Sequence, residues 1–264
     1  MIDRQLVTYA DIPCYVLAET GGVPRAEIFL YHGWGSNAEK QCFRGALLAG
    51  FGYRVIVPEI SGHGMRGTLD YDGPEAVLDF LKVLRQSIDE CIRLADAVFM
   101  PDHPHFLIGH SLGGMIVLGA IAVLRDKVQG VAAMNSSAAW GDALATLQGV
   151  FAAGEDVAST LCLPEAQALR MQLAPFDPAC WQADGITTPV LLTNGSLDKT
   201  LPATLNAGFL AQHNLPQVRQ VVIDDAGHVV TDSALREVVA FIEMHRQDNF
   251  PGNHPQLVDN CPVL

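Results

Sequence analysis

Short runs of uninterrupted apolar residues alternate with longer helical patterns along most of this chain. Strands of this kind are predicted over 26–32, 53–59, 105–109, 128–135, 188–195 and 217–225. Helices are predicted among them over 37–50, 74–98, 112–125 and 232–246. Such an alternation favours an α/β architecture, with a mostly parallel sheet covered by helices on both faces. In these sheets ligands bind beyond the carboxyl ends of the strands, so functional residues are sought there.

Three segments stand apart from this alternation. The runs 5–9 and 14–19 predict an antiparallel hairpin that opens the chain. Residues 138–187 contain two or three short helical patterns but no clear strand, and they are predicted to form a small helical cap inserted between two strands. The polar, proline-bearing tail 247–264 is predicted to pack irregularly or to fray. The remaining residues, 1–137 and 188–246, form the predicted α/β core.

Charge and composition exclude several classes of function. A formal net charge of −13 repels phosphate backbones, which argues against nucleic acid as a partner. The longest apolar stretch, "MIVLGAIAVL", is too short to span a bilayer, and "MIDRQLVTYADIPC" does not resemble a signal peptide, so no membrane association and a cytoplasmic location are expected. The six cysteines are scattered without a C-x-x-C pair, so neither a zinc site nor a disulfide framework is predicted.

A candidate nucleophile lies where a predicted strand meets a predicted helix. The sequence "GHSLG" at 109–113 places Ser111 at this junction, between Gly109 and Gly113. A very tight turn would project the serine hydroxyl from the edge of the sheet, and the glycines are needed because side chains there would collide across the turn. An ordinary serine in a glycine-rich junction is the alternative, but the strand–turn–helix context favours a nucleophile.

Nine histidines could supply the base that activates this serine, and their positions relative to the predicted strands distinguish the candidates. His228 follows the carboxyl end of a predicted strand, on a loop that contains Gly227. His110 neighbours the serine, but adjacent side chains diverge on such a turn. The others lie at the wrong end of a strand, in other loops, at helix ends or near the tail; they are His32, His63, His103, His105, His213, His245 and His254. The general base is therefore predicted to be His228.

The acid that orients the base should also follow a strand. Asp198, in "NGSLDKTLP", comes just after the predicted strand 188–195 and could accept the ring N–H of His228. Asp224 and Asp225 precede His228 by only a few residues, which makes it difficult for their carboxylates to turn back and contact its ring. Asp142 follows the preceding strand and is the weaker alternative. Asp198 is the predicted acid.

Two backbone amides are candidates for an oxyanion hole, which binds the negative charge that develops during acyl transfer. The amide of Leu112 opens the helix after the serine, where N–H groups favour an anion. The loop "YHGWGS" follows an earlier strand and could present the amide of Trp34 from the opposite side. Trp34 can also serve as a core aromatic, because the amide rather than the ring would do the chemistry.

Taken together, five motifs resemble the α/β-hydrolase superfamily. They are "HGWG", "SGHG", "GHSLGG", "NGSLDKTLP" and "DDAGHVV", which span about residues 26–245. The order Ser111, Asp198, His228 is also the order of that family. Within it, the chain is similar to small bacterial esterases and to the dienelactone-hydrolase-like and serine-aminopeptidase-like groups. "HGWG" also resembles carboxylesterases that cleave methyl esters of acyl chains, although their turn usually reads G-W-S-L-G rather than G-H-S-L-G.

These residues predict a carboxylesterase that acts on a small-molecule ester and needs no metal or organic cofactor; the oligomeric state is left open. The predicted cap would roof the serine with apolar side chains, which suits small or medium acyl groups. The apolar cap residues expected to line the site are Trp140, Leu144, Leu147, Val150, Phe151, Leu161, Leu163, Leu169, Met171 and Trp181.

Other chemistry remains open on the same residues. The scaffold also supports thioester, lactone and C–C bond hydrolysis and hydroxynitrile cleavage, and a non-catalytic receptor is a further possibility. A peptidase would want an acidic pocket for the substrate amine, which Asp142, Glu155 and Asp156 could provide.

Overall fold

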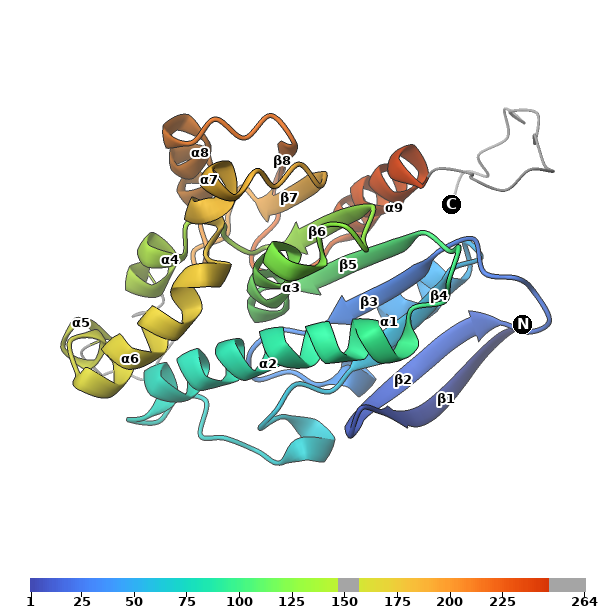
Figure 1. Ribbon diagram of the computed structural model, residues 1–264, viewed down its shortest axis with the longest axis horizontal. Helices are drawn as coiled ribbons and strands as arrows, with labels where there is room; N and C mark the ends of the chain where they lie inside the picture. Colours follow the sequence, from blue (N-terminus) through green and yellow to red (C-terminus); the bar gives the residue numbers. More distant parts are fainter. Residues whose placement is uncertain (147–156, 247–264) are drawn as a thin grey trace.

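The computed structural model describes residues 1–146 and 157–246, and its centre is a sheet of eight strands (Figure 1). The strands are β1 (Ile2–Tyr9), β2 (Ile12–Glu19), β3 (Glu27–Tyr31), β4 (Arg54–Pro58), β5 (His105–His110), β6 (Gly130–Met134), β7 (Val190–Gly195) and β8 (Val218–Ile223). Their order across the sheet is β1-β2-β4-β3-β5-β6-β7-β8. The pairs β1–β2 and β2–β4 are antiparallel, and the other neighbouring strands are parallel. The predicted mostly parallel sheet is confirmed, as is the opening hairpin.

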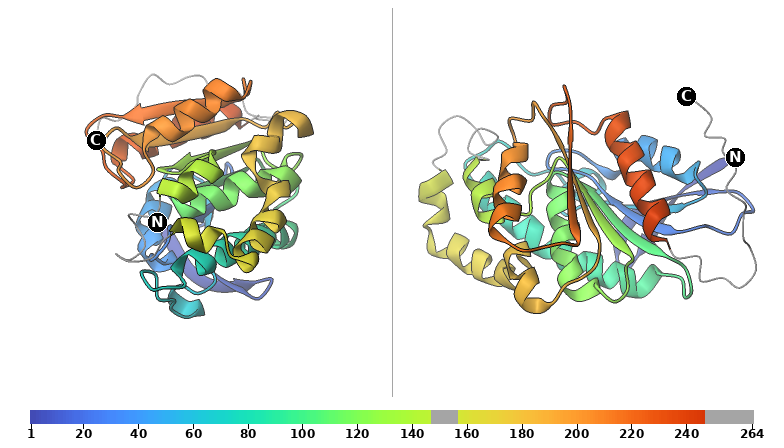
Figure 2. Two further views of the ribbon diagram at one scale, coloured as in Figure 1. Left: turned by 90° about the vertical axis from the view of Figure 1, so that its left-hand side faces the viewer. Right: turned by 90° about the horizontal axis from the view of Figure 1, so that it is seen from above.

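Helices cover both faces of this sheet (Figure 2). Those outside the 138–187 segment are α1 (Ala38–Ala49), α2 (Ala76–Val98), α3 (Leu112–Leu124), α8 (Ala203–Gln212) and α9 (Asp232–His245), with a 3-10 helix η1 (Gly64–Arg66). Apolar residues of α1 and α9 form one core with the sheet, and those of α2 and α3 form another. Along β3 the side chains alternate between them: Ile28 and Leu30 join the first core, whereas Phe29 and Tyr31 join the second.

The apolar spacing of the sequence explains these helices. In α2, Val77, Leu81, Leu84 and Ile88 recur every three or four residues, and all four side chains are buried in the core. Each predicted strand and helix of the core is present, and its ends lie within two residues of the prediction except in β1, which begins three residues earlier, at Ile2. α8 lies just before His213, where the sequence indicated a helix end.

The segment 138–187 lies between β6 and β7, and its described regular elements are all helices. It contains α4 (Trp140–Thr146), α5 (Val157–Leu161), α6 (Pro164–Leu173), η3 (Ala174–Phe176), η4 (Pro178–Cys180) and α7 (Trp181–Asp184). Figure 1 shows α4, α5 and α6 beyond the carboxyl ends of the strands, where α6 packs against α2. Leu147, Val150, Phe151, Glu155, Asp156 and the tail 247–264 lie outside the described residues. The division into core and cap domains stays a prediction.

The longest described helix, α2, is amphipathic rather than uniformly apolar. Across the part of the chain that the structure describes, no helix combines the length and hydropathy that crossing a membrane requires.

Candidate active site

Ser111 lies in a very tight turn between β5 and α3. Its backbone is held at φ 54° and ψ −118°, a strained conformation for a residue with a side chain. A Cβ on Gly109 would come within 2.1 Å of the Gly113 backbone, and a Cβ on Gly113 within 2.5 Å of the His32 carbonyl oxygen. The two glycines are therefore required by close backbone approach, as the sequence predicted.

The structure brings Ser111, His228 and Asp198 into one hydrogen-bonded chain. His228 Nε2 lies 3.0 Å from Ser111 Oγ, and His228 Nδ1 lies 2.8 Å from Asp198 Oδ2. A carboxylate can only accept, so Nδ1 carries the proton and Nε2 is left to accept the serine hydroxyl hydrogen. The ring of His228 is partly exposed, whereas the Asp198 side chain is fully buried. Three groups placed in this way can act as a nucleophile, a base and an orienting acid.

Asp198 is held ionised by several donors. Thr200 N and Leu201 N donate to its Oδ1 at 2.9 and 3.0 Å. Burial by itself would raise the pKa of Asp198, but the hydrogen bonds from His228, Leu201 and Asn135 outweigh it and hold the pKa below its ordinary value. A carboxylate that stays charged keeps the Nδ1–H tautomer of its partner histidine.

The alternative acids lie elsewhere. Asp225 occupies the turn after β8, where its amide donates to Ser196 Oγ at 3.0 Å, and Asp224 precedes it. Asp142 is exposed in the first turn of α4. Of the four carboxylates considered, Asp198 is the one that contacts His228.

His110 lies beside the site, is only partly exposed, and is unsuited to serve as a base. Its ring centre lies 5.2 Å from that of His228, and its Nε2 has no hydrogen-bond partner among the described residues. Burial lowers the pKa of His110 to about 3, so its ring is neutral near pH 7.

Both candidate oxyanion amides lie next to the serine. Leu112 is the first residue of α3, and the first N–H groups of a helix have no partner within it. On the other side, a Cβ on Gly33 would lie 3.2 Å from Ser111 Cβ, which places the loop of Gly33 and Trp34 against the nucleophile. The Trp34 indole is fixed separately, because its N–H donates to the Tyr71 carbonyl oxygen at 3.1 Å.

Sequence reasoning missed Asn135, which follows β6 at a φ of 46°. Its Nδ2 donates to Asp198 Oδ2 at 3.1 Å and to the Gly227 carbonyl oxygen at 2.7 Å, so it joins the acid to the loop that carries His228. Asparagine tolerates the left-handed region better than most residues. An asparagine at the carboxyl end of a predicted strand, between those bearing Ser111 and Asp198, was the signal that could have found it.

An apolar cavity reaches α3 at Met115, and neither Ser111 nor His228 is among its lining residues. It has a volume of about 530 Å³ and lies among α2, α3, α4 and α6, with Leu84, Met115, Trp140 and Leu144 among its lining residues. Met115 N donates to the Ser111 carbonyl oxygen at 3.1 Å, so one wall of the cavity lies one helical turn from the nucleophile. Gln167, Arg170 and Asp177 add polar groups to its lining.

The sequence also predicted no metal ligation. Within residues 1–146 and 157–246, no group of three or more His, Cys, Asp or Glu side chains is arranged to hold a metal ion.

Comparison with known proteins identifies the family. Residues 28–241 match the model of the alpha/beta hydrolase family. Esterase YjfP of Escherichia coli (strain K12) is 26% identical over 93% of this chain and all of its own length. The crystal structure of TT1662 from Thermus thermophilus superposes with a TM-score of 0.71 at 21% identity, covering 92% of this chain and 98% of that one. A lipase in its open form gives a TM-score of 0.64 at 17% identity, covering 92% and 99%. The chain therefore belongs to the alpha/beta hydrolase family.

Proposed function

We propose that this protein is a serine carboxylesterase that cleaves esters of small or medium acyl chains. The observation that carries the proposal is the hydrogen-bonded chain from Ser111 Oγ through His228 to Asp198. His228 Nε2 takes the serine proton as Oγ attacks the ester carbonyl carbon, and Asp198 stabilises the imidazolium that forms. The relation to a protein named an esterase supports an ester substrate.

The two backbone amides and the histidine complete the reaction. Trp34 N–H and Leu112 N–H donate to the oxyanion of the tetrahedral intermediate. His228 then gives its proton to the leaving alkoxide oxygen as the C–O bond breaks, which leaves an acyl group on Ser111. Water attacks this acyl-enzyme after His228 removes its proton, and the serine leaves with that proton restored.

The apolar cavity that Met115 lines, one helical turn beyond Ser111, supports an apolar acyl group. Its lining is dominated by Leu, Met and Trp side chains, which would exclude water from an acyl chain. Of the cap residues predicted to line the site, Trp140, Leu144 and Met171 lie on this cavity. Trp181 is buried in the core, and Leu163 is exposed on the surface, so neither belongs to this group.

The test is hydrolysis of p-nitrophenyl acetate and butyrate by the wild type, Ser111→Ala and Ser233→Ala. Ser233 is an exposed serine in the first turn of α9 and serves as the matched control. Loss of the nucleophile should lower kcat by at least about a thousandfold, whereas the control should keep the wild-type rate. Equal rates for wild type and Ser111→Ala would contradict the proposal.

The alternatives predict different outcomes with the same variants. Turnover of thioesters, lactones, C–C substrates or cyanohydrins in preference to esters, with loss in Ser111→Ala, would assign another reaction to the same residues. Preferred cleavage of aminoacyl-arylamides would indicate a peptidase. A wild-type Ser111 that no fluorophosphonate probe labels would indicate a non-catalytic receptor.

A further inference from the structure

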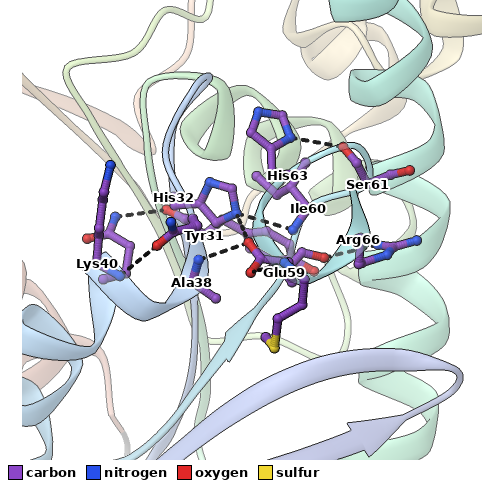
Figure 3. A network of polar contacts seen from close by, with 12 residues as sticks. Tyr31, His32, Ala38, Lys40, Glu59, Ile60, Ser61, His63 and Arg66 are labelled. Atoms are coloured by element: carbon purple, nitrogen blue, oxygen red, sulfur yellow. Dashed lines mark hydrogen bonds and ion pairs between the residues drawn. The ribbon is translucent and has the colours of Figure 1, made fainter. Parts of the chain in front are cut away.

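The loop that carries Trp34 is held by three buried polar side chains: its own His32, and Glu59 and His63 from the segment after β4. This loop, His32–Gly35, follows β3 and is called here the HGWG loop. Figure 3 shows His32, from the HGWG loop, near Glu59 and His63, which belong to the segment that follows β4. All three are buried, and none of them belongs to the chain of contacts from Ser111 to Asp198.

His32 holds the peptide group that contains the candidate oxyanion donor. Its Nδ1 lies 2.9 Å from the Gly33 carbonyl oxygen and can only donate to it. The Gly33 carbonyl and the Trp34 N–H belong to one planar trans peptide, so they point in opposite directions. Fixing the carbonyl therefore fixes the direction of the Trp34 N–H. Ser36 N also donates to this carbonyl, at a longer distance of 3.2 Å.

Glu59 holds the ring of His32 from its other side. Its Oε1 lies 3.0 Å from His32 Nε2 and accepts from Ala38 N at 2.9 Å, at the start of α1. Its Oε2 accepts from Met65 N at 3.3 Å. Burial would raise the pKa of Glu59, but the hydrogen bonds from His32 and Ala38 outweigh it and lower the pKa, so the carboxylate is charged near pH 7. Ile60 N donates to the same nitrogen, His32 Nε2, at 3.2 Å; that bond uses the Nε2 lone pair, whereas Nε2 donates to Glu59 only when it carries a proton.

His63 fixes the far end of the HGWG loop. Burial lowers the pKa of His63 to about 4, so the ring is neutral near pH 7. Its Nδ1 donates to the Ser61 carbonyl oxygen at 2.9 Å, which leaves Nε2 free to accept from Gly35 N at 3.2 Å. The peptide groups on both sides of Trp34 are thereby anchored to buried side chains.

We propose that His32 is a positioning residue that aims the Trp34 N–H at the oxyanion, and that Glu59 keeps the His32 ring in place. This inference rests on the proposed acyl-transfer function. It assigns to the glutamate–histidine pair a role parallel to that of Asp198 and His228, but directed at a backbone amide instead of the nucleophile. A donor aimed in advance stabilises the transition state without reorganisation during the reaction.

The decisive test compares His32→Asn with His32→Leu. The asparagine amide nitrogen stands the same number of bonds from Cα as His32 Nδ1, so it can still donate to the Gly33 carbonyl oxygen. Leucine cannot donate. Both variants abandon the Glu59 contact, so they share its cost in stability. We expect His32→Leu to lower kcat for a p-nitrophenyl ester about tenfold to a hundredfold with little change in KM, and His32→Asn to recover most of that loss.

A second pair of variants tests the glutamate. Glu59→Gln is compared with Glu27→Gln, because Glu27 is also fully buried and pairs with a histidine, His105, at 3.2 Å. Glu27 lies at the start of β3, at the opposite end of the strand from the HGWG loop. Both variants should lower the thermal midpoint. Only Glu59→Gln should also lower kcat, by a smaller factor than His32→Leu, and weaken binding of a trifluoromethyl ketone by the same factor.

Three outcomes would overturn the inference. His32→Asn and His32→Leu could give the same kcat, the loss could fall on KM alone, or Glu59→Gln could match Glu27→Gln in activity. The rate at which a fluorophosphonate labels Ser111 separates this inference from the proposed function. A wild type that cleaves no ester but is labelled faster than His32→Leu would contradict the esterase proposal and support the positioning role. A Ser111 that reacts with neither reagent would contradict both.

Discussion

Asp198 and His228 depend on an asparagine that touches both of their loops. Asn135 donates to the carboxylate of Asp198 and to the carbonyl of Gly227, the residue before His228. Four adjacent strands, β5 to β8, are thus followed by Ser111, Asn135, Asp198 and His228 in the same order as the strands. Asn135 therefore links the end of β6 to the loops that carry Asp198 and His228.

Replacing Asn135 by glycine should weaken this arrangement without disturbing the backbone. Glycine adopts the positive φ of this position freely, so the variant removes only the side-chain donors. Loss of a hydrogen bond to a charged group should reduce the free energy of unfolding by about 1.5–3 kcal/mol and lower kcat more than it raises KM. Urea denaturation and steady-state kinetics measure both. Unchanged kcat would show that the acid and base keep their geometry without it.

At the scale of elements, the turn from β5 to α3 is the most restrictive feature of the fold. Gly109→Ala would place a Cβ 2.1 Å from the Gly113 backbone and should lower the free energy of unfolding by about 3 kcal/mol or more, with loss of activity. The matched control is Gly208→Ala in α8, where no atom lies within 4 Å of the added carbon. This helix should gain about 0.5–1 kcal/mol and the enzyme should keep its activity. Chemical denaturation of both variants checks the prediction.

Much of the candidate site could be predicted from the sequence because its residues follow recognisable strands. Ser111, Asp198 and His228 each follow a strand whose apolar run is plain in the sequence, and parallel strands bring those ends together. Asn135 and Glu59 were missed because their roles depend on which strands are neighbours, and strand order is not written in local periodicity. The HGWG loop and Glu59 follow β3 and β4, and the parallel pairing of these two strands brings them together.

The 138–187 segment was predictable only in outline. Helices α5 and α7 have five and four residues, too few to show a helical period or to be stable alone. Their positions are set by packing, as the burial of Trp181 at the start of α7 illustrates. Short elements of this kind owe their structure to tertiary contacts that the local sequence does not encode.

At the scale of the whole molecule, the cavity between the 138–187 helices and α3 should set the acyl length. Leu144→Trp would fill part of it and should reduce turnover of p-nitrophenyl octanoate relative to acetate, by about fourfold for each methylene excluded. Leu163→Trp, at an exposed position outside the cavity lining, is the control and should leave the ratio unchanged. An unchanged octanoate-to-acetate ratio in Leu144→Trp would place the acyl chain elsewhere.

The stability of the molecule should fall in mild acid because buried histidines must remain neutral. The pKa of His63 is lowered from 6.5 to about 4, so the unfolded chain binds this proton first as the pH drops. Stability is therefore lost between about pH 6.5 and pH 4. Glu59 and Asp198, whose pKa values are lowered from 4.5 and 3.8, begin to lose their contributions as the pH falls below about 4.5 and about 3.8.

His63→Gln tests this expectation, since glutamine can accept a hydrogen bond but does not titrate. The free energy of unfolding, measured in urea at pH 7 and at pH 4, should decline less in this variant, by up to about 3 kcal/mol. A decline equal to that of the wild type would mean that other groups, such as His110, dominate the acid response.

The strands that precede Ser111 and His228 differ in how many neighbours hold them. Ser111 extends from a strand that has hydrogen-bonded neighbours on either side, whereas His228 extends from β8, the border of the sheet, which pairs with β7 alone. Border strands detach at a lower cost than interior ones. Under mildly destabilising conditions we therefore expect His228 to lose its position before Ser111 does, which would abolish activity while Ser111 stays in place. Activity should return once β8 pairs with β7 again.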